Sequence, residues 1–334
     1  MTRALVTGAT GMLGSHLVER LLTAHVEVRA FVRPTSDTHY LETLPVEIVT
    51  ANATDRAAIR QAVAGSHWVF HLASDFDAGS AFRTGEGLEK YNEADLRLTE
   101  GLLLASQEAS VRRLVYASSV SVYSLNAASP IAESAPLDPV SDYGRSKLAA
   151  EGRVRAYQQQ GLPTVILRPC IIYGPRDRHF LPAAMRLAQL PLLPLIDGGR
   201  NLIDLVYAGD VAELMWKATQ SDAAVGKVYN AASGAPRPLR ELLGDYRQLT
   251  GRAPRTCAMS AGAFERFARL THRYWGRYAP GLESLLSPVG VSYMGRDVYY
   301  DVSRARSDLD YAPQVNFKQG VALTLAYVGN RAAA

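Results

Sequence analysis

Three side chains in the middle of the sequence have the chemistry to exchange a proton with a bound molecule. Tyr143 and Lys147 are four residues apart, so a helix would place both on one face. Ser119, the second residue of the pair Ser118 and Ser119, follows the apolar run at residues 114–117, at the edge where parallel sheets bind their ligands. An ammonium group favours ionisation of a neighbouring phenol, and a serine hydroxyl can hold a substrate oxygen within reach of it. The three residues therefore predict acid–base chemistry on an alcohol or carbonyl group.

A glycine-rich segment near the N-terminus predicts a site for a dinucleotide. Gly8, Gly11 and Gly14 are spaced Gly-x-x-Gly-x-x-Gly between a short apolar run and a helical pattern. Glycines there permit positive φ and close approach of backbone N–H groups to a pyrophosphate at a helix N-terminus. The other interpretation is a glycine-rich turn with no ligand, and the strand-before, helix-after context favours the dinucleotide.

The end of the second apolar run indicates which dinucleotide. An NAD site usually has a carboxylate at that position, whereas an arginine there suits the 2′-phosphate of NADP. The segment 26–36 has no carboxylate at its C-terminal end, and Arg33 lies there instead. We predict NADP(H), with NAD(H) as the alternative. The competing interpretation is that Arg33 is a solvated loop residue.

Composition excludes several classes of protein. The chain has 334 residues, 48% apolar and 20% charged, which is typical of about two globular domains. Its 36 basic and 32 acidic residues are scattered, so nucleic acid is not an expected partner. Two cysteines cannot build a disulfide framework, and His67, His71 and His179 have no metal-ligand spacing, so no metal site is expected. No apolar run reaches the length of a membrane span, and the first residues do not read as a signal peptide. We expect a cytoplasmic protein without stable membrane insertion.

The elements that must position these residues alternate between strand and helix. Such alternation predicts a doubly wound parallel α/β sheet of the Rossmann type, with a smaller C-terminal mixed α/β lobe. We expect residues 1–170, with 203–232 returning to them, to hold the cofactor, and residues 171–202 and 233–330 to bind the substrate. The expected strands are Arg3–Thr7, Glu27–Val32, Val46–Val49, Trp68–Leu72, Leu114–Ala117 and Thr164–Leu167, and the expected helices are Leu13–Thr23, Arg56–Ala64, Ala94–Glu108, Tyr143–Gln159 and Asp210–Thr219.

Taken together, these motifs resemble the extended short-chain dehydrogenase/reductases over nearly the whole chain. The resemblance also rests on residues 70–74, 118–123, 168–175, 210–212 and 300–306. It implies that Ser119, Tyr143 and Lys147 are catalytic, with Tyr143 as the acid/base and Lys147 on the nicotinamide ribose. It implies a homodimer formed through the helices Ala94–Glu108 and Tyr143–Gln159. The expected cofactor-binding residues are Gly8, Thr10, Gly11, Met12, Leu13, Gly14, Arg33, Asn52, Ala53, Leu72, Ala73, Ser74, Ala117, Ser118, Tyr143, Lys147, Pro169 and Ile172, and the expected substrate-binding residues are Ser121, Tyr173 and Arg176.

Two positions depart from that family's pattern. Asp95 stands where the helix before the serine loop usually carries Asn, which puts in doubt the usual backbone contact or water relay. Asn52 replaces an Asp beside the adenine, and an amide still pairs with adenine edges.

The substrate side is closest to the branch with 3β-hydroxysteroid dehydrogenases and dihydroflavonol reductases. Ile203 holds the position where nucleotide-sugar epimerases usually have a phosphate-clamping Arg, although Arg200 is nearby. The dehydratase acids are also missing from residues 119–121. We predict reversible alcohol–ketone hydride transfer on an apolar hydroxysteroid, flavonoid-like or 3-keto acyl substrate. A nucleotide-sugar 4-epimerase and a non-catalytic cofactor-binding regulatory module are the alternatives. The basic, aromatic segment 261–288 is either a pocket lid or a helix packed inward.

Overall fold

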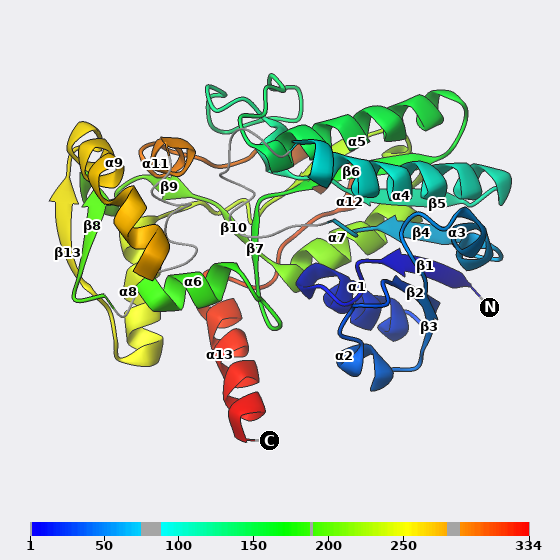
Figure 1. Ribbon diagram of the computed structural model, residues 1–334, viewed down its shortest axis with the longest axis horizontal. Helices are drawn as coiled ribbons and strands as arrows, with labels where there is room; N and C mark the ends of the chain where they lie inside the picture. The colour runs from blue at the N-terminus through cyan, green and yellow to red at the C-terminus, as the bar shows by residue number, and fades with distance from the viewer. Residues whose placement is uncertain (1, 75–87, 188–189, 279–287, 334) are drawn as a thin grey trace.

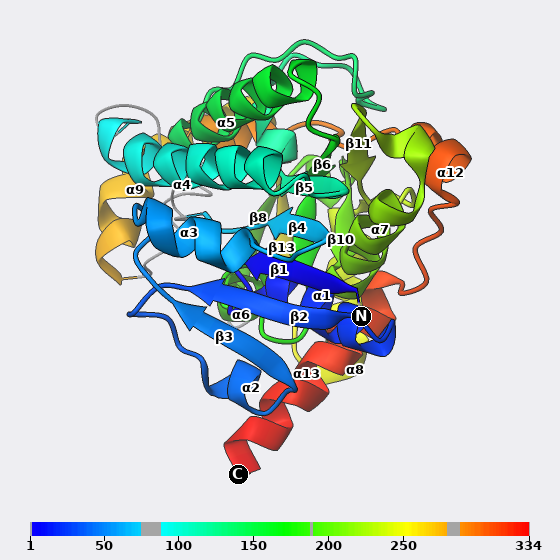
Figure 2. The same cartoon turned by 90° about the vertical axis from the view of Figure 1, so that its right-hand side faces the viewer.

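Seven parallel strands form the central sheet, and helices cover both of its faces (Figures 1 and 2). The computed structural model describes residues 2–74, 88–187, 190–278 and 288–333. The strand order is β11-β6-β5-β4-β1-β2-β3, and every neighbouring pair is parallel. The predicted doubly wound α/β fold is confirmed. The strands of this sheet are β1 (Arg3–Thr7), β2 (Glu27–Val32), β3 (Val46–Thr50), β4 (Trp68–His71), β5 (Arg113–Ala117), β6 (Thr164–Pro169) and β11 (Val228–Ala231).

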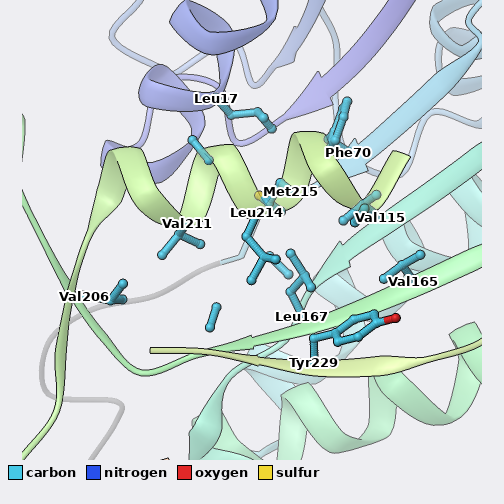
Figure 3. Packing of buried hydrophobic residues seen from close by; sticks show 14 of the residues in the cluster. Leu17, Phe70, Val115, Val165, Leu167, Val206, Val211, Leu214, Met215 and Tyr229 are labelled. Carbon is cyan, nitrogen blue, oxygen red and sulfur yellow. The ribbon is translucent and has the colours of Figure 1, made fainter. Parts of the chain in front are cut away.

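Two sets of helices sandwich the sheet because alternate strand side chains point to opposite faces. One face packs against α1, α7 and α12, and Figure 3 shows Leu17 of α1 and Leu214 and Met215 of α7 over Val115 and Leu167. The other face packs against α3, α4 and α5. The helices of this lobe are α1 (Met12–Thr23), α2 (His39–Glu42), α3 (Arg56–Val63), α4 (Leu88–Glu108), α5 (Asp142–Gln159), α7 (Ala208–Gln220) and α12 (Ser303–Leu309), with 3₁₀ turns at Val120–Val122 (η1) and Asp222–Ala224 (η3).

A second lobe lies beyond the carboxyl ends of β5 and β6, on the left of Figure 1. It contains three small two-stranded sheets and its own apolar clusters, one of which brings Tyr173 and Leu181 together with Leu242 and Val321. Its elements are β7 (Ile171–Tyr173), α6 (Phe180–Leu187), β8 (Leu192–Ile196), η2 (Asp197–Gly199), β9 (Leu202–Ile203), β10 (Leu205–Tyr207), β12 (Arg237–Pro238), α8 (Leu239–Thr250), β13 (Arg255–Met259), α9 (Ala261–Tyr278), α11 (Pro288–Met294) and α13 (Phe317–Ala333).

The predicted ranges of the first lobe differ from the observed elements by at most two residues at either end, except at α4, and short elements such as β11 and α2 were not predicted. The seventh strand β11 is only four residues long, and no strand was predicted there, although residues 203–232 were expected to return to the first lobe. Helix α4 begins at Leu88 rather than Ala94. The four-residue α2 also went unpredicted, because so short a segment carries no readable period.

A buried ion pair ties α5 to strand β6 of the sheet. The Glu151 carboxylate accepts hydrogen bonds from Arg168 Nε at 2.8 Å and Nη2 at 2.7 Å, and both side chains are completely buried. Attraction between two desolvated charges offsets the cost of burying each one, so loss of either partner leaves an uncompensated charge.

We therefore expect Arg168→Met to lower the free energy of unfolding by about 3–5 kcal/mol, because Glu151 would stay buried with only the more exposed Arg155, at 3.5 Å, as a cationic partner. Combining Arg168→Met with Glu151→Leu removes both charges, and this double variant should lose less than the single one. Urea unfolding followed by circular dichroism measures both values. A double variant less stable than Arg168→Met would contradict this account of the pair.

Candidate active site

The serine loop after β5 and the first turn of α5 bring the predicted catalytic residues together. The Ser119 hydroxyl accepts a hydrogen bond from the backbone N–H of Ser121 at 3.1 Å and donates to the Ser121 hydroxyl at 3.2 Å. Ser119 also forms a side-chain hydrogen bond with Tyr143. The Lys147 ammonium lies one turn further along α5, 5.7 Å from the centre of the Tyr143 ring.

Gly144 makes the close packing of α5 against the serine loop sterically possible. A Cβ atom at Gly144 would lie 2.3 Å from the backbone oxygen of Ser121 and 2.9 Å from Pro139. Carbon and oxygen atoms do not approach that closely without displacing one another, so only glycine lets α5 dock against the serine loop. The helix begins at this point because the Ser141 hydroxyl caps it by accepting from the Gly144 N–H at 3.1 Å.

Burial perturbs both ionisable members of the pair. Loss of solvent raises the pKa of Tyr143 to about 12, with the Ser119 hydrogen bond lowering it and the negative charge of Asp95 raising it further. Burial lowers the pKa of Lys147 to about 8, opposed by the charges of Asp95 and Glu151. At neutral pH the site therefore holds a protonated phenol beside an ammonium group. The Lys147 ammonium also donates to the Ala117 carbonyl at 3.0 Å.

The glycine-rich loop has the shape that a dinucleotide requires. Gly8 has φ +71°, and a Cβ atom there would lie 2.7 Å from the Ala73 backbone nitrogen. A Cβ atom at Gly14 would lie 2.1 Å from the Gly8 carbonyl oxygen. Gly11 begins α1 without a side-chain cap, and the first turn has no acidic residue, so the positive helix terminus suits a pyrophosphate. The residues present fit a nicotinamide dinucleotide.

The other predicted cofactor residues lie at the carboxyl ends of the strands, as the Rossmann arrangement requires. Arg33 is exposed just after β2, and Asn52 is exposed after β3. Ser118 also follows its strand, but its buried hydroxyl donates to Glu151 at 2.6 Å. A cofactor contact of Ser118 would therefore be made by its backbone. The remaining residues near strand ends are Ala53, Leu72, Ala73, Ser74, Ala117, Pro169 and Ile172, and Thr10, Met12 and Leu13 lie in the glycine loop or the first turn of α1.

Of the three predicted substrate residues, the structure brings only Ser121 to the catalytic group. Tyr173 is 1% exposed and packs against Tyr207 and Phe317 in the core of the second lobe. The Arg176 guanidinium pairs with Glu19 at 2.8 Å and lies over the ring of Tyr40, joining the second lobe to α1 and α2. These contacts give Tyr173 and Arg176 structural roles, and they offer no support for a contact of either with substrate.

Two groups near the catalytic pair escaped the sequence reasoning. Glu151 lies two helical turns after Tyr143, and this spacing indicates that both residues share one face of α5. Its partner Arg168 is distant in sequence, so the ion pair could not be predicted. Asp95 was flagged only as a departure from a family pattern. Its carboxylate accepts from the Ser74 hydroxyl at 3.1 Å, a contact that the sequence could not indicate.

Of the segment 261–288, residues 261–278 form α9, and residues 279–287 lie outside the described part of the chain. Phe264 and Ala268 of α9 are buried against Ile196 and Val291, which fits a stripe packed inward, while Leu270 is 84% exposed. The later residues of that segment have no described side chains. Among described residues, no helix has both the length and the apolarity to cross a bilayer, and no cluster of three metal-ligating side chains is present.

Comparison with known proteins assigns the family. The model of the NAD dependent epimerase/dehydratase family matches residues 4–232. The chain belongs to this family. It is therefore an enzyme of the epimerase, dehydratase and reductase group with a nicotinamide cofactor, and the predicted resemblance to extended short-chain dehydrogenase/reductases is confirmed.

Several relatives that align with nearly the whole chain are named as reductases. A 2-alkyl-3-oxoalkanoate reductase of Stenotrophomonas maltophilia is 30% identical over 96% of this chain and 97% of its own. A 4-hydroxy-2-methyl-3-oxo-4-farnesyl-3,4-dihydroquinoline-1-oxide ketoreductase of Stigmatella aurantiaca is 28% identical over 96% and 94%. The solved UDP-glucose 4-epimerase of Stenotrophomonas maltophilia, with bound NAD, has a TM-score of 0.80 at 20% identity and full coverage of both chains, which shows a shared fold.

The close approach at Gly144 predicts different outcomes for two substitutions in one helix. Gly144→Ala should destabilise the protein by about 1–3 kcal/mol, because α5 must move off the serine loop. Gly152→Ala, an exposed site with nothing within 4 Å, should gain up to about 1 kcal/mol from helix propensity. Thermal unfolding of both variants measures the contrast, and equal stability of the two would refute the steric argument.

Proposed function

We propose that the protein is an NADP(H)-dependent oxidoreductase that interconverts a secondary alcohol and a ketone on an apolar substrate. The observation that carries the proposal is the convergence of Ser119, Tyr143 and Lys147 in one partly buried site at the carboxyl edge of the sheet. A cofactor-binding regulatory module, the non-enzymatic alternative, would not require a glycine at position 144 to bring Tyr143 against Ser119.

The three side chains divide the chemistry between them. Bound nicotinamide supplies or accepts the hydride. Ser119 orients the substrate oxygen, for which its hydroxyl is held by the backbone of Ser121. Tyr143 gives a proton to that oxygen during reduction and removes it during oxidation. Lys147 keeps positive charge beside the phenol and would hold the nicotinamide ribose.

The protonation state of Tyr143 favours reduction as the working direction. Its pKa of about 12 keeps the phenol protonated at neutral pH, ready to donate to a developing alkoxide. Oxidation needs the phenolate, so its rate should rise with pH toward that pKa. In the reverse direction, Tyr143 would lose its proton more readily beside the positive charge that an oxidised nicotinamide would supply.

Side chains and relatives both support an apolar substrate with a keto group. Ile203 stands where a phosphate-clamping arginine would be needed, and it is held in β9 between Arg237 of β12 and Val298. Arg200 is exposed and lines a surface depression with Arg240 and Ser260. Ser119 is not among the residues that line this depression. Relatives named as reductases of 3-oxoalkanoates and of a farnesylated quinoline favour the 3-keto acyl form, with hydroxysteroids and flavonoid-like compounds next.

A substrate panel tests this function. The enzyme should oxidise NADPH with a long-chain 2-alkyl-3-keto acid, and Tyr143→Phe should lose about 100-fold or more in kcat while its affinity for NADPH stays within twofold. Absorbance of the reduced nicotinamide follows turnover, and fluorescence titration gives the affinity.

The same panel addresses the alternative. UDP-glucose should not be converted, because nothing at Ile203 compensates the desolvation of a diphosphate. Chromatography of UDP-sugars detects redox-neutral epimerisation. Conversion of UDP-glucose to an epimer without any ketone reduction would replace the proposed function with a 4-epimerase.

Preference for NADP(H) rests on Arg33, an exposed cation after β2 where the 2′-phosphate would lie. Arg33→Ala should raise the Michaelis constant for NADPH about tenfold or more, because a hydrogen bond to a charged group is worth about 1.5–3 kcal/mol. The constant for NADH should change by less than twofold. Equal losses with both cofactors would show that Arg33 does not read the phosphate.

We further infer that the protein is cytoplasmic and forms a homodimer. Residues 1–170 and 203–232 would bind the cofactor, and residues 171–202 and 233–330 would bind the substrate. Support for the dimer is the half-buried Leu104 of α4 and Leu148 of α5 beside the exposed Ala149, on the two helices expected to pair. Leu103 and Ala150 already pack in the chain's own core. The two cysteines are free thiols, which fits a reducing compartment.

A further inference from the structure

The segment that follows β2 forms a tight turn that begins at Arg33. Pro34 is the second residue of this β-turn, a position that proline favours, and the Ser36 N–H donates to the Arg33 carbonyl at 2.9 Å. The Ser36 hydroxyl accepts from the Arg33 N–H at 3.2 Å. A β-turn brings its first and last Cα atoms within about 7 Å of one another. The next residue, Asp37, therefore stays close to Arg33, and a carboxylate shares the turn with the cation.

An arginine of the second lobe pairs with this carboxylate. Arg178 Nη2 donates to Asp37 Oδ2 at 3.3 Å, although the two residues are 141 positions apart in sequence. The other oxygen of Asp37 accepts from the His39 N–H at 3.3 Å, at the start of α2. The side chains of Arg178 and Asp37 are 62% and 48% exposed. Because an ion pair this exposed contributes little to stability, its main effect is on the charge of the turn.

The segment that carries Arg178 is held in place by its own hydrogen bonds. The neighbouring Asp177 accepts from the N–H groups of His179 and Phe180 at 2.8 Å and 3.0 Å, and from that of Leu181 at 2.7 Å. These contacts satisfy N–H groups at the start of α6. The second lobe therefore presents Arg178 to the turn from a fixed backbone.

A second arginine of the same segment offsets another acid close to the turn. Arg176 Nη2 donates to Glu19 of α1 at 2.8 Å, and its guanidinium lies 4.4 Å from the centre of the Tyr40 ring in α2. The Tyr40 hydroxyl also donates to Glu19. Glu19 and Asp37 thus each pair with a cation from the second lobe, and α2 is clamped between the two pairs.

We propose that Arg178 is a specificity-determining residue for the cofactor. By offsetting the charge of Asp37, it keeps the turn at Arg33 positive and so favours a dinucleotide with a 2′-phosphate. A carboxylate repels that phosphate and a guanidinium attracts it, whereas the 2′-hydroxyl of NAD is neutral and responds to neither. The inference rests on the proposed binding of the 2′-phosphate at this turn. It adds that the cofactor selectivity of the first lobe depends on a residue of the second.

Cofactor binding tests this proposal without any substrate. Fluorescence titrations with NADPH and with NADH give two dissociation constants, and their ratio is compared between variants at about 0.01 M salt, where screening is weak. Arg178→Gln should weaken NADPH binding about threefold or more and NADH binding by less than about 1.5-fold, because a cation close to the phosphate is lost. Arg178→Lys keeps the charge, and its ratio should stay within about 1.5-fold of the wild type.

Removal of the acid should have the opposite effect. Asp37→Asn should tighten NADPH binding about threefold and leave NADH binding unchanged, because a carboxylate near the phosphate is lost. Combining Asp37→Asn with Arg178→Gln restores the net charge, so the ratio should return to within about 1.5-fold of the wild type. Arg255→Gln is the matched control, since it removes the same charge from an exposed site on β13, far from α2 in Figure 1. Its ratio should equal that of the wild type.

Salt separates an effect of charge from an effect of shape. At about 1 M salt the Debye length is about 3 Å, so the differences between the variants should shrink. Three results would overturn the proposal: an unchanged ratio in Arg178→Gln, an equal loss of affinity for both cofactors, or a selective loss that persists at high salt.

Arg33→Ala distinguishes this inference from the proposed role of Arg33. If Arg33→Ala weakens both cofactors equally while the Asp37 and Arg178 variants shift the ratio in opposite directions, the role of Arg33 fails and this inference stands. If Arg33→Ala weakens NADPH alone while Arg178→Gln leaves the ratio unchanged, the proposed cofactor preference stands and this inference fails.

Discussion

The arrangement of the active site depends on one buried carboxylate, that of Glu151. It accepts a hydrogen bond from Ser118 in the serine loop at 2.6 Å and two from Arg168 on β6. A fully desolvated charge of this kind is tolerated only while its partners stay in place, so three segments distant in sequence are held in one geometry. The interaction therefore does more than contribute stability, because it orders the loop and the helix that carry the proposed catalytic residues.

The packing of α5 against the serine loop determines both the positions and the protonation states of the proposed catalytic side chains. Tyr143, Lys147 and Glu151 recur at four-residue intervals and share a face of α5. Gly144 allows this face to touch the loop, and the resulting loss of solvent raises the pKa of the tyrosine and lowers that of the lysine. Packing and the perturbed protonation of the pair thus have one cause.

Sequence reasoning was most accurate where the signal is local. Strands β1 and β2 contain the continuous apolar runs Ala4–Val6 and Ala30–Val32, because both faces of the sheet are covered. The glycine spacing and the Tyr–Lys interval are likewise readable within one short segment each. It could not indicate an environment that comes from distant residues. Tyr173 and Arg176 are predicted to bind substrate, and the structure packs Tyr173 in the core of the second lobe and pairs Arg176 with Glu19 of α1. The Ser74 contact of Asp95 likewise exists only in three dimensions.

The central claim is that a hydride passes from the nicotinamide ring to a ketone while a phenol at position 143 supplies the proton. A single turnover with NADPH deuterated at the transferable C4 position and a long-chain 3-keto acid tests it most directly. Mass spectrometry of the product should find one deuterium on the new carbinol carbon, and Tyr143→Phe should form no such product on the same timescale. A carbinol without deuterium, or deuterated product formed equally fast by Tyr143→Phe, would contradict the account.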